Sequence, residues 1–157
     1  MISYKILSTE KCVILTNEVL EHFSRHRQIG INSKETGGQL FAKVEENRII
    51  VEKVTGPRTI DRRGRFHFMP TRKAEQREIN NMFSVGLHYV GDWHTHPEKK
   101  PSPSHIDISS MSECFRKSKH ELDSFILIIV GQADPPGGIW LSLHRAQSYE
   151  TLSPISK

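Results

Sequence analysis

Two histidines separated by one residue, His94 and His96, are the most informative feature of this sequence. On a β-strand, residues i and i+2 project from the same face, so both imidazoles can reach one metal ion. Seven residues, three of them prolines, lead from His96 to Ser104, and Asp107 follows three positions later. A stiff loop of this kind can bring Asp107 back as an anionic third ligand from the first turn of a helix.

Two histidines and one aspartate leave the fourth position of a tetrahedral Zn²⁺ ion open for water, as in catalytic rather than structural zinc sites. Bound zinc lowers the pKa of that water and polarises a substrate carbonyl. Glu35 precedes Gly37 and Gly38, where backbones can approach closely, and is the candidate base that moves the proton to a leaving amine. Ser104 is the candidate hydrogen-bond donor to the oxyanion. The sequence therefore predicts a hydrolase with one Zn²⁺ per chain.

Each part has a simpler interpretation when taken alone. Ser104-x-x-Asp107 before a helix is also an ordinary capping-box variant. An H-x-H pair also occurs as surface or core histidines, and Glu35 is one of many solvated acids. The metal-site interpretation rests on the joint occurrence of these residues. Asp92 shares the predicted face of the two histidines and could orient an imidazole or compete as a ligand, whereas Trp93 is predicted to lie in the core on the opposite face.

The remaining histidines and the two cysteines are not predicted to bind metal. His105 is expected to face solvent, and the other histidines lack the spacing of ligands. Cys12 and Cys114 are far apart and lack C-x-x-C spacing, which is typical of reduced thiols. The histidines without ligand spacing are His22, His26, His67, His88, His120 and His144.

Helices and strands are predicted to alternate along the chain, so that a mixed sheet covered by helices positions these residues. Thr16 is the expected N-cap of the first helix. The expected helices cover residues 17–29, 71–84 and 104–118, and the expected strands cover 38–44, 48–54, 87–96, 125–130 and 139–145. No repeat or linker divides the chain, so one domain is expected over residues 1–157.

Composition excludes some classes of function. The 22 Lys and Arg residues against 18 Asp and Glu give a net charge of +4, which is too weak a bias to indicate nucleic-acid binding. The longest apolar run, residues 125–130, is too short for a membrane span, and no signal peptide is visible, so a cytoplasmic location is expected. Four arginines in the 58–65 loop are expected either to grip an acidic partner or to form a solvated basic loop: Arg58, Arg62, Arg63 and Arg65.

The candidate site residues resemble the pattern of JAB/JAMM metallopeptidases, in which an upstream Glu is followed by H-x-H, seven residues and S-x-x-D. Residues 35–40 are similar to the family's glutamate strand, and residues 91–97 are similar to its metal strand. The resemblance spans about residues 15–145. It implies a three-layer α/β sandwich akin to the cytidine deaminases, and zinc-dependent hydrolysis of peptide or isopeptide bonds. Ala42 departs from the glycine that many members have there, but its methyl group threatens neither metal nor base.

Within the family, the chain resembles the compact prokaryotic members associated with CBASS antiphage operons, on its GDWHTHP and P-S-x-x-D segments. That resemblance implies two partners: a cGAS-like nucleotidyltransferase joined through its C-terminal residue to other molecules, and a ubiquitin-transfer-like enzyme. The extended tail of such a substrate could add a strand to a sheet edge near the zinc. The chain lacks the long insertions with which eukaryotic deubiquitinases hold ubiquitin, which argues against ubiquitin itself.

Three other functions stay open. The chain could be a processing protease that trims a ubiquitin-like or sulfur-carrier precursor. It could be a RadC-like domain of DNA metabolism, although that motif usually reads H-N-H-P-S-G and this chain has Glu98 and Lys99 after Pro97. It could also be a non-catalytic scaffold, which the complete set of candidate metal and catalytic residues argues against.

Overall fold

The computed structural model describes residues 1–156, which form ten strands and three helices. The strands are β1 (Ile2–Lys5), β2 (Cys12–Leu15), β3 (Gly37–Val44), β4 (Arg48–Val54), β5 (Arg62–Arg63), β6 (Phe68–Met69), β7 (His88–Thr95), β8 (Phe125–Val130), β9 (Ile139–His144) and β10 (Tyr149–Thr151). The helices are α1 (Asn17–Arg25), α2 (Arg72–Ser84) and α3 (His105–Lys117). No helix among these residues is both long and apolar enough to cross a bilayer.

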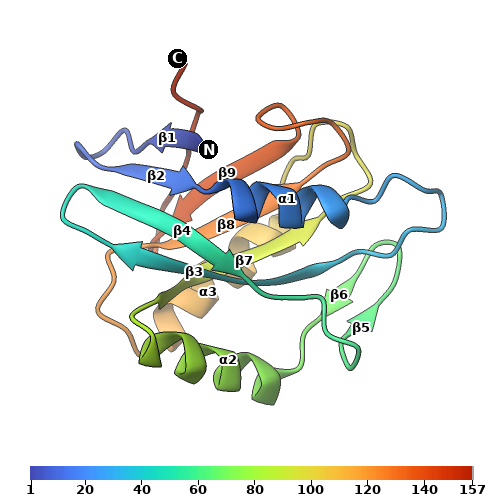
Figure 1. The fold of residues 1–157 in the computed structure, drawn as a ribbon, viewed down its shortest axis with the longest axis horizontal. Helices are drawn as coiled ribbons and strands as arrows, with labels where there is room; N and C mark the ends of the chain where they lie inside the picture. The colour runs from blue at the N-terminus through green and yellow to red at the C-terminus, as the bar shows by residue number, and fades with distance from the viewer. Residues whose placement is uncertain (157) are drawn as a thin grey trace.

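Eight strands form one curled mixed sheet in the order β1-β2-β4-β3-β7-β8-β9-β10 (Figure 1). The β2–β4 and β7–β8 pairs are parallel, and the other neighbours are antiparallel. Helix α1 covers one face, whereas α2 and α3 lie on the other. The predicted three-layer α/β fold with a mixed central sheet is therefore confirmed. The short β5–β6 ribbon forms a separate two-stranded sheet.

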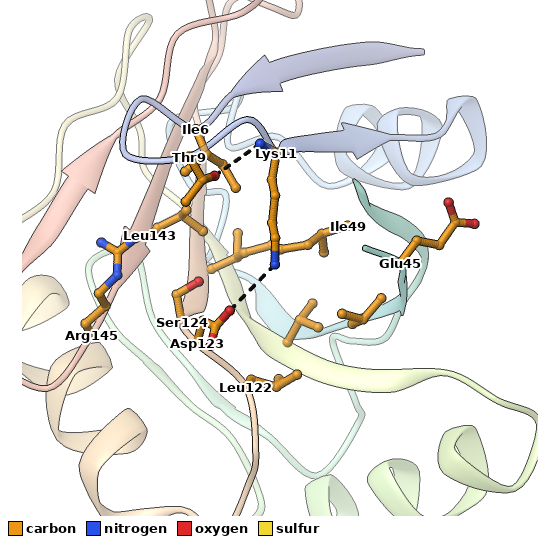
Figure 2. A pocket seen from close by; sticks show the side chains of 13 residues that line it. Ile6, Thr9, Lys11, Glu45, Ile49, Leu122, Asp123, Ser124, Leu143 and Arg145 are labelled. Carbon is orange, nitrogen blue, oxygen red and sulfur yellow. Dashed lines mark hydrogen bonds and ion pairs between the residues drawn. The ribbon is translucent and has the colours of Figure 1, made fainter. Parts of the chain in front are cut away.

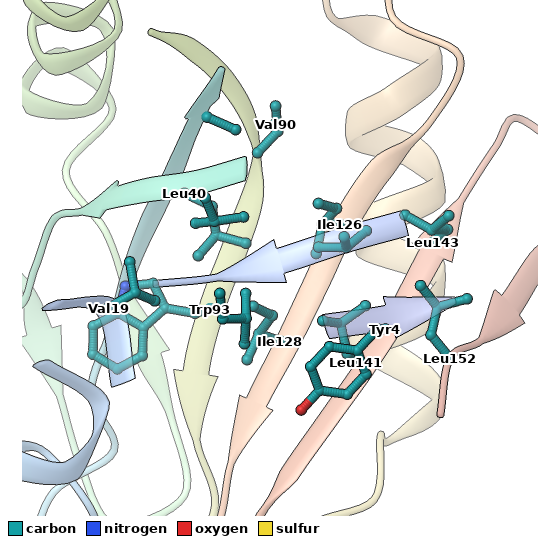
Figure 3. Close-up of a cluster of buried hydrophobic side chains, with 14 of the residues drawn as sticks. Tyr4, Val19, Leu40, Val90, Trp93, Ile126, Ile128, Leu141, Leu143 and Leu152 are labelled. Carbon is teal, nitrogen blue, oxygen red and sulfur yellow. The ribbon is translucent and has the colours of Figure 1, made fainter. Parts of the chain in front are cut away.

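Strand β8 has side chains buried on both faces of the sheet, as its uninterrupted apolar sequence predicts. Alternate residues of a strand point to opposite faces. Ile126, Ile128 and Val130 join the larger cluster, which includes Val19 and Phe23 of α1 (Figure 3). The other three residues pack with Met111 of α3: Phe125, Leu127 and Ile129.

A β-bulge in β7 sets which of its side chains enter the core. Leu40 of β3 pairs with Gly91, but the next residue of β3 pairs with Tyr89, so Val90 is the extra residue. Gly91 has φ 146°, and a Cβ on it would lie 1.8 Å from a backbone oxygen of β8. Because of the bulge, both Val90 and Trp93 point into the core although they are three residues apart. The predicted core position of Trp93 is confirmed, with 1% of it exposed.

The structure corrects the predicted elements at three places. The first helix begins after Thr16 as predicted, but it ends at Arg25 rather than at residue 29. Beyond it, the buried Gln28 side chain donates to the carbonyl oxygens of Ser33 and Arg65, which holds the following segment in a non-helical path, and Ile29 is exposed. The strands β1, β2 and β10 were not predicted. The ribbon β5–β6 also lies in a segment that was predicted as loop.

The two edges of the sheet approach each other through the segment that follows β10. Tyr4 of β1 forms an isolated antiparallel bridge with Pro154, and the N–H of Ile155 donates to the carbonyl oxygen of Ser3 at 2.8 Å. These contacts join residues about 150 positions apart, so local sequence patterns do not reveal them.

His144→Phe is expected to make the free energy of unfolding less dependent on pH. His144 is fully buried, its Nδ1 has no partner within residues 1–156, and burial lowers its pKa from 6.5 to about 4. A histidine whose pKa falls on folding contributes stability above pH 6.5, and this contribution is lost as the pH falls through 4, because the unfolded chain binds the proton more tightly. The free energy of unfolding is expected to fall by roughly 3 kcal/mol through this effect.

The measurement is urea unfolding of both proteins at several pH values between 7.5 and 4. The phenylalanine keeps a ring beside Tyr149, on which the His144 imidazole stacks at 5.3 Å. A difference between the two proteins that stays constant over this pH range would contradict the assignment.

Candidate active site

Three elements of the fold bring the predicted residues together. His94 lies near the end of β7, and His96 follows directly after that strand. Glu35 precedes β3, which pairs with β7 so that Gly37 lies opposite His94. Asp107 lies in the first turn of α3. Four of the five predicted residues therefore meet at one end of the β3–β7 pair, where α3 begins.

The three predicted metal ligands form a triangle, in which a different oxygen of Asp107 faces each imidazole. The Nε2 atoms of His94 and His96 lie 3.2 Å apart. Oδ1 of Asp107 lies 3.2 Å from the first of these nitrogens, and Oδ2 lies 3.3 Å from the second. Ligands about 2.0–2.1 Å from a tetrahedral Zn²⁺ ion lie about 3.3 Å from one another, so this donor set fits such an ion. Glu35 offers an oxygen within 4.8 Å of the histidine nitrogens.

Two further contacts orient the triangle. The Nδ1 atom of His96 lies 3.0 Å from Oε1 of Glu98, which leaves Nε2 directed at the other donor atoms. Oδ2 of Asp107 accepts a hydrogen bond from the backbone N–H of Ser104 at 2.8 Å. Metal-binding imidazoles are commonly held by a carboxylate in this way. The sequence interpretation missed Glu98, and its position two residues after His96 is the signal that could have indicated it.

The electrostatics of the cluster follow from burial and from the close contacts. Burial raises the pKa of the Glu35 carboxyl, and the nearby His94 and His96 offset only part of this effect. Burial acts in the same direction on Asp107, but hydrogen bonds from the two imidazoles outweigh it and hold the pKa of that carboxyl well below its usual range. For His96, burial disfavours the charged form, but the hydrogen bond and charge attraction of Asp107, together with the hydrogen bond to Glu98, outweigh burial and raise its pKa.

Ser104 serves as the N-cap of α3. Its Oγ accepts a hydrogen bond from the N–H of Asp107 at 3.1 Å, and the Asp107 side chain accepts from the N–H of Ser104 in return, so the capping box is complete. Ser104 is exposed, and its cap contact uses the hydroxyl oxygen only as an acceptor. The O–H group remains able to donate to another oxygen, so capping does not prevent the predicted role.

The β5–β6 ribbon holds the backbone of Glu35. The N–H of Glu35 donates to the carbonyl oxygen of Gly64 at 2.6 Å. The Nε of Arg63 donates to the carbonyl oxygen of Glu35 at 3.0 Å, and its Nη2 donates to Oγ1 of Thr36 at 2.5 Å. On the other side, the N–H of Thr36 donates to Oγ1 of Thr95 at 3.0 Å. The backbone beside the Glu35 carboxylate is therefore fixed from both sides.

The arginines of residues 58–65 do not act as one group, contrary to both sequence interpretations. Arg58 is largely buried and pairs with Glu78 and Asp61. Arg63 holds the Glu35 segment. Only the remaining two, Arg62 and Arg65, are exposed.

Asp92 lies on the predicted face, two residues before His94, but it neither orients an imidazole nor joins the donor triangle. Its Oδ1 accepts a hydrogen bond from the hydroxyl of Tyr89 at 3.0 Å. Burial raises the pKa of Asp92 to about 6. Within residues 1–156, no hydrogen bond joins it to either His94 or His96. It lines a neighbouring cleft instead.

A cleft of about 300 Å³ opens beside the cluster. It lies between α2 and α3 over the outer face of the sheet, and its lining includes Glu35, His94 and Asp107 together with Glu75 and Asp92. A smaller cavity of about 60 Å³ lies at the other end of the sheet, where Lys11 pairs with Asp123 at its rim (Figure 2). A substrate can reach the predicted site through the larger cleft, which Glu35, His94 and Asp107 line.

Comparison with protein families matches residues 16–143 to the family described as prokaryotic homologs of the JAB domain. Three curated relatives carry the name CD-NTase/cGAS isopeptidase. The Escherichia coli protein is 30% identical over 82% of this chain and 80% of its own length. The Enterobacter hormaechei protein is 32% identical over 83% and 72%, and the Vibrio cholerae protein is 30% identical over 78% of both.

Two solved structures resemble the fold. A Desulfitobacterium hafniense protein superposes with a TM-score of 0.62 at 22% identity over 88% of both chains. A Salinibacter ruber protein superposes with a TM-score of 0.53 at 17% identity over 88% of this chain and 87% of its own. At these identities the likeness concerns the fold alone.

Proposed function

This chain belongs to the prokaryotic JAB domain family, and we propose on that premise that it is a zinc-dependent isopeptidase that releases molecules joined to the C-terminus of a cGAS-like nucleotidyltransferase. Its similarity to three proteins named CD-NTase/cGAS isopeptidase supports the substrate. The observation that carries the chemistry is the triangle formed by His94, His96 and Asp107, with a partly buried Glu35 beside it.

We assign the metal to zinc because two imidazoles and one carboxylate are a donor set of catalytic zinc sites. A zinc ion supplies Lewis acidity there, which polarises the scissile carbonyl and makes water a better nucleophile at neutral pH. His94, His96 and Asp107 hold the ion, and Glu98 keeps the His96 imidazole in its orientation.

The remaining chemistry belongs to Glu35 and Ser104. The Glu35 carboxylate accepts a proton from the attacking water as the new carbon–oxygen bond forms. It then delivers this proton to the leaving nitrogen as the carbon–nitrogen bond breaks, which yields a carboxylic acid and an amine. The Ser104 hydroxyl donates a hydrogen bond to the carbonyl oxygen as that atom gains negative charge.

The substrate tail is proposed to bind in extended form beside the β5–β6 ribbon. Within residues 1–156 the two strands pair only with one another, so each keeps an unpaired edge, and Gly64 between them contacts the Glu35 backbone. Unpaired strand edges accept an additional strand readily. The exposed Phe66 and Met69 side chains on this ribbon offer apolar contacts to such a tail.

The test is a gel assay with a cGAS-like nucleotidyltransferase from the same genome, fused through its C-terminus to a reporter protein. We expect release of the reporter at the junction, loss of release after treatment with a chelator, and recovery on addition of Zn²⁺. A zinc-loaded protein that leaves the fusion intact but trims a ubiquitin-like or sulfur-carrier precursor would replace this substrate by the processing alternative. A protein that binds no zinc would favour the scaffold.

Arg63→Ala is expected to lower kcat by about tenfold with little change in KM or zinc content, because a misplaced base mainly affects the chemical step. Arg63 contacts Glu35 through its backbone rather than through its carboxylate. Arg62→Ala is the control, because Arg62 is an exposed arginine of the same ribbon. Equal effects of the two substitutions on KM alone would instead indicate contact with the substrate.

A further inference from the structure

The cleft continues beyond the proposed catalytic residues into an acidic region that the mechanism does not use. Its lining includes Asp92 from the outer face of β7 and Glu75 from α2. Cys114 and Met111 of α3 line the same region, so the two carboxylates lie in a partly apolar setting. Carboxylates in such surroundings are costly to the fold unless a cation or a hydrogen-bond donor accompanies them.

Within residues 1–156, Glu75 has no such partner. Only 9% of this residue is exposed, and no hydrogen bond or ion pair to its carboxylate occurs within the described part of the chain, residues 1–156. Burial, followed by repulsion from Asp92, raises its pKa to about 7. The carboxylate therefore lines the cleft, where its oxygens can accept hydrogen bonds from solvent or from a ligand.

Asp92 adds a second acceptor on the same side of the cleft. One of its oxygens accepts from the Tyr89 hydroxyl at 3.0 Å, and no partner of the other is found within residues 1–156. The contact with Tyr89 fixes the direction of the carboxylate, but it does not neutralise a negative charge. Two acids therefore face one space without a basic partner in contact.

The nearby arginines do not supply this partner. Arg58 is committed to Glu78 and Asp61. Arg72 lines the cleft, but it is exposed, and within residues 1–156 no ion pair joins it to Glu75 or Asp92. Within residues 1–156 no basic side chain is in contact with the two acids, so a positively charged ligand group in the cleft can fill this place.

We propose that this region binds a basic side chain of the substrate, a lysine or arginine that lies within two residues of the cleaved bond. This inference rests on the proposed function and adds a determinant of substrate choice to it. Asp92 and His94 are two positions apart on one strand face, a separation of about 6–7 Å. An extended lysine or arginine side chain has this reach, so a residue bound next to the scissile bond can place its charge between Asp92 and Glu75.

The first test does not depend on catalysis. Glu75→Gln removes a buried unpaired carboxylate and keeps the shape of the side chain, so the thermal midpoint of the substrate-free protein is expected to rise by about 2–4 °C. Glu113→Gln on α3 is the matched control, because Glu113 is exposed and its one ion pair within residues 1–156 is with Lys117, and it should shift the midpoint by less than about 1 °C. A lower midpoint for Glu75→Gln would reveal a structural role of the carboxylate and overturn the inference.

The second test measures substrate specificity with the nucleotidyltransferase–reporter fusion. The two residues before the junction and the two residues after it are replaced, one position at a time, by Lys, Gln or Glu. At one of these positions, the wild-type protein is expected to favour Lys over Gln by about tenfold in kcat/KM, which corresponds to about 1.4 kcal/mol. Glu75→Gln should abolish this preference, Glu75→Lys should reverse it toward Glu, and Glu113→Gln should retain it.

The outcomes separate this inference from the proposed function. Cleavage of all fusions at similar rates, or a Lys preference that survives in Glu75→Gln, overturns the basic-side-chain site and leaves the isopeptidase in place. Cleavage of none of them contradicts the proposed function. Fluorescence polarisation with tail peptides that carry Lys or Gln then decides the inference: binding that favours the Lys peptide in wild-type protein but not in Glu75→Gln supports it, and equal binding of both peptides overturns it.

Discussion

Glu35→Gln is expected to lower kcat/KM on the fusion substrate by about 10³-fold while the protein still binds about one zinc ion per chain. The substitution removes the group that takes and returns the proton, and general acid–base catalysis contributes about 10²–10⁴-fold. It keeps nearly the same shape and leaves the donor triangle of His94, His96 and Asp107 unchanged. The measurements are steady-state kinetics and zinc content on the same preparation.

Two results would contradict the role of Glu35. A Glu35→Gln protein that cleaves at the wild-type rate would assign the proton transfer to another group. A Glu35→Gln protein that loses its zinc would instead identify Glu35 as a metal ligand. The zinc content tests this possibility, because the Glu35 carboxylate lies close to the histidine nitrogens. Glu98→Gln provides a useful comparison, because Glu98 also contacts the cluster but only through Nδ1 of His96. It should weaken zinc binding by about 10–100-fold without removing the proton-transfer group.

The candidate site was predictable because its main parts are short patterns. The same-face placement of His94 and His96 follows from strand geometry, and Asp107 follows from helix capping at Ser104. The long strands of the sheet centre and the three helices were recognised for the same reason, since each carries its periodicity or capping signal within one segment. The capping interpretation and the catalytic interpretation are also compatible. The Ser104 and Asp107 side chains cap α3 and still have free hydrogen-bonding or metal-binding capacity.

The features that could not be predicted depend on contacts between distant segments. The bulge at Val90 and Gly91 arises from how β7 fits between β3 and β8, and alternation in the sequence does not reveal it. Likewise, the two-residue strands β5 and β6 are too short to carry a pattern, yet they hold Glu35 through Gly64 and Arg63. The unpartnered carboxylate of Glu75 became apparent only when α2 was placed over the cleft.

Asp107→Ala is expected to remove both zinc and activity. Asp107 supplies the only anionic donor of the triangle and contacts both imidazoles, so its loss leaves two neutral ligands on adjacent positions of one strand face. After dialysis against a competing chelator, the zinc content should fall from about one ion per chain to less than about one tenth, since three protein ligands are the norm for catalytic zinc. Cleavage of the fusion should fall to background.

Ser104→Ala is the control that separates this effect from damage to α3. Both substitutions break the same capping box, and each should cost about 1 kcal/mol of stability. Only Asp107→Ala removes a proposed ligand, so Ser104→Ala should keep its zinc while kcat falls by about 10²–10³-fold through loss of the oxyanion donor. If both variants lost zinc equally, zinc binding would depend on the capped start of α3 rather than on the Asp107 carboxylate itself. If Asp107→Ala kept its zinc, another residue would have to be the third ligand, and Glu35 is the candidate because its carboxylate lies within 4.8 Å of the histidine nitrogens.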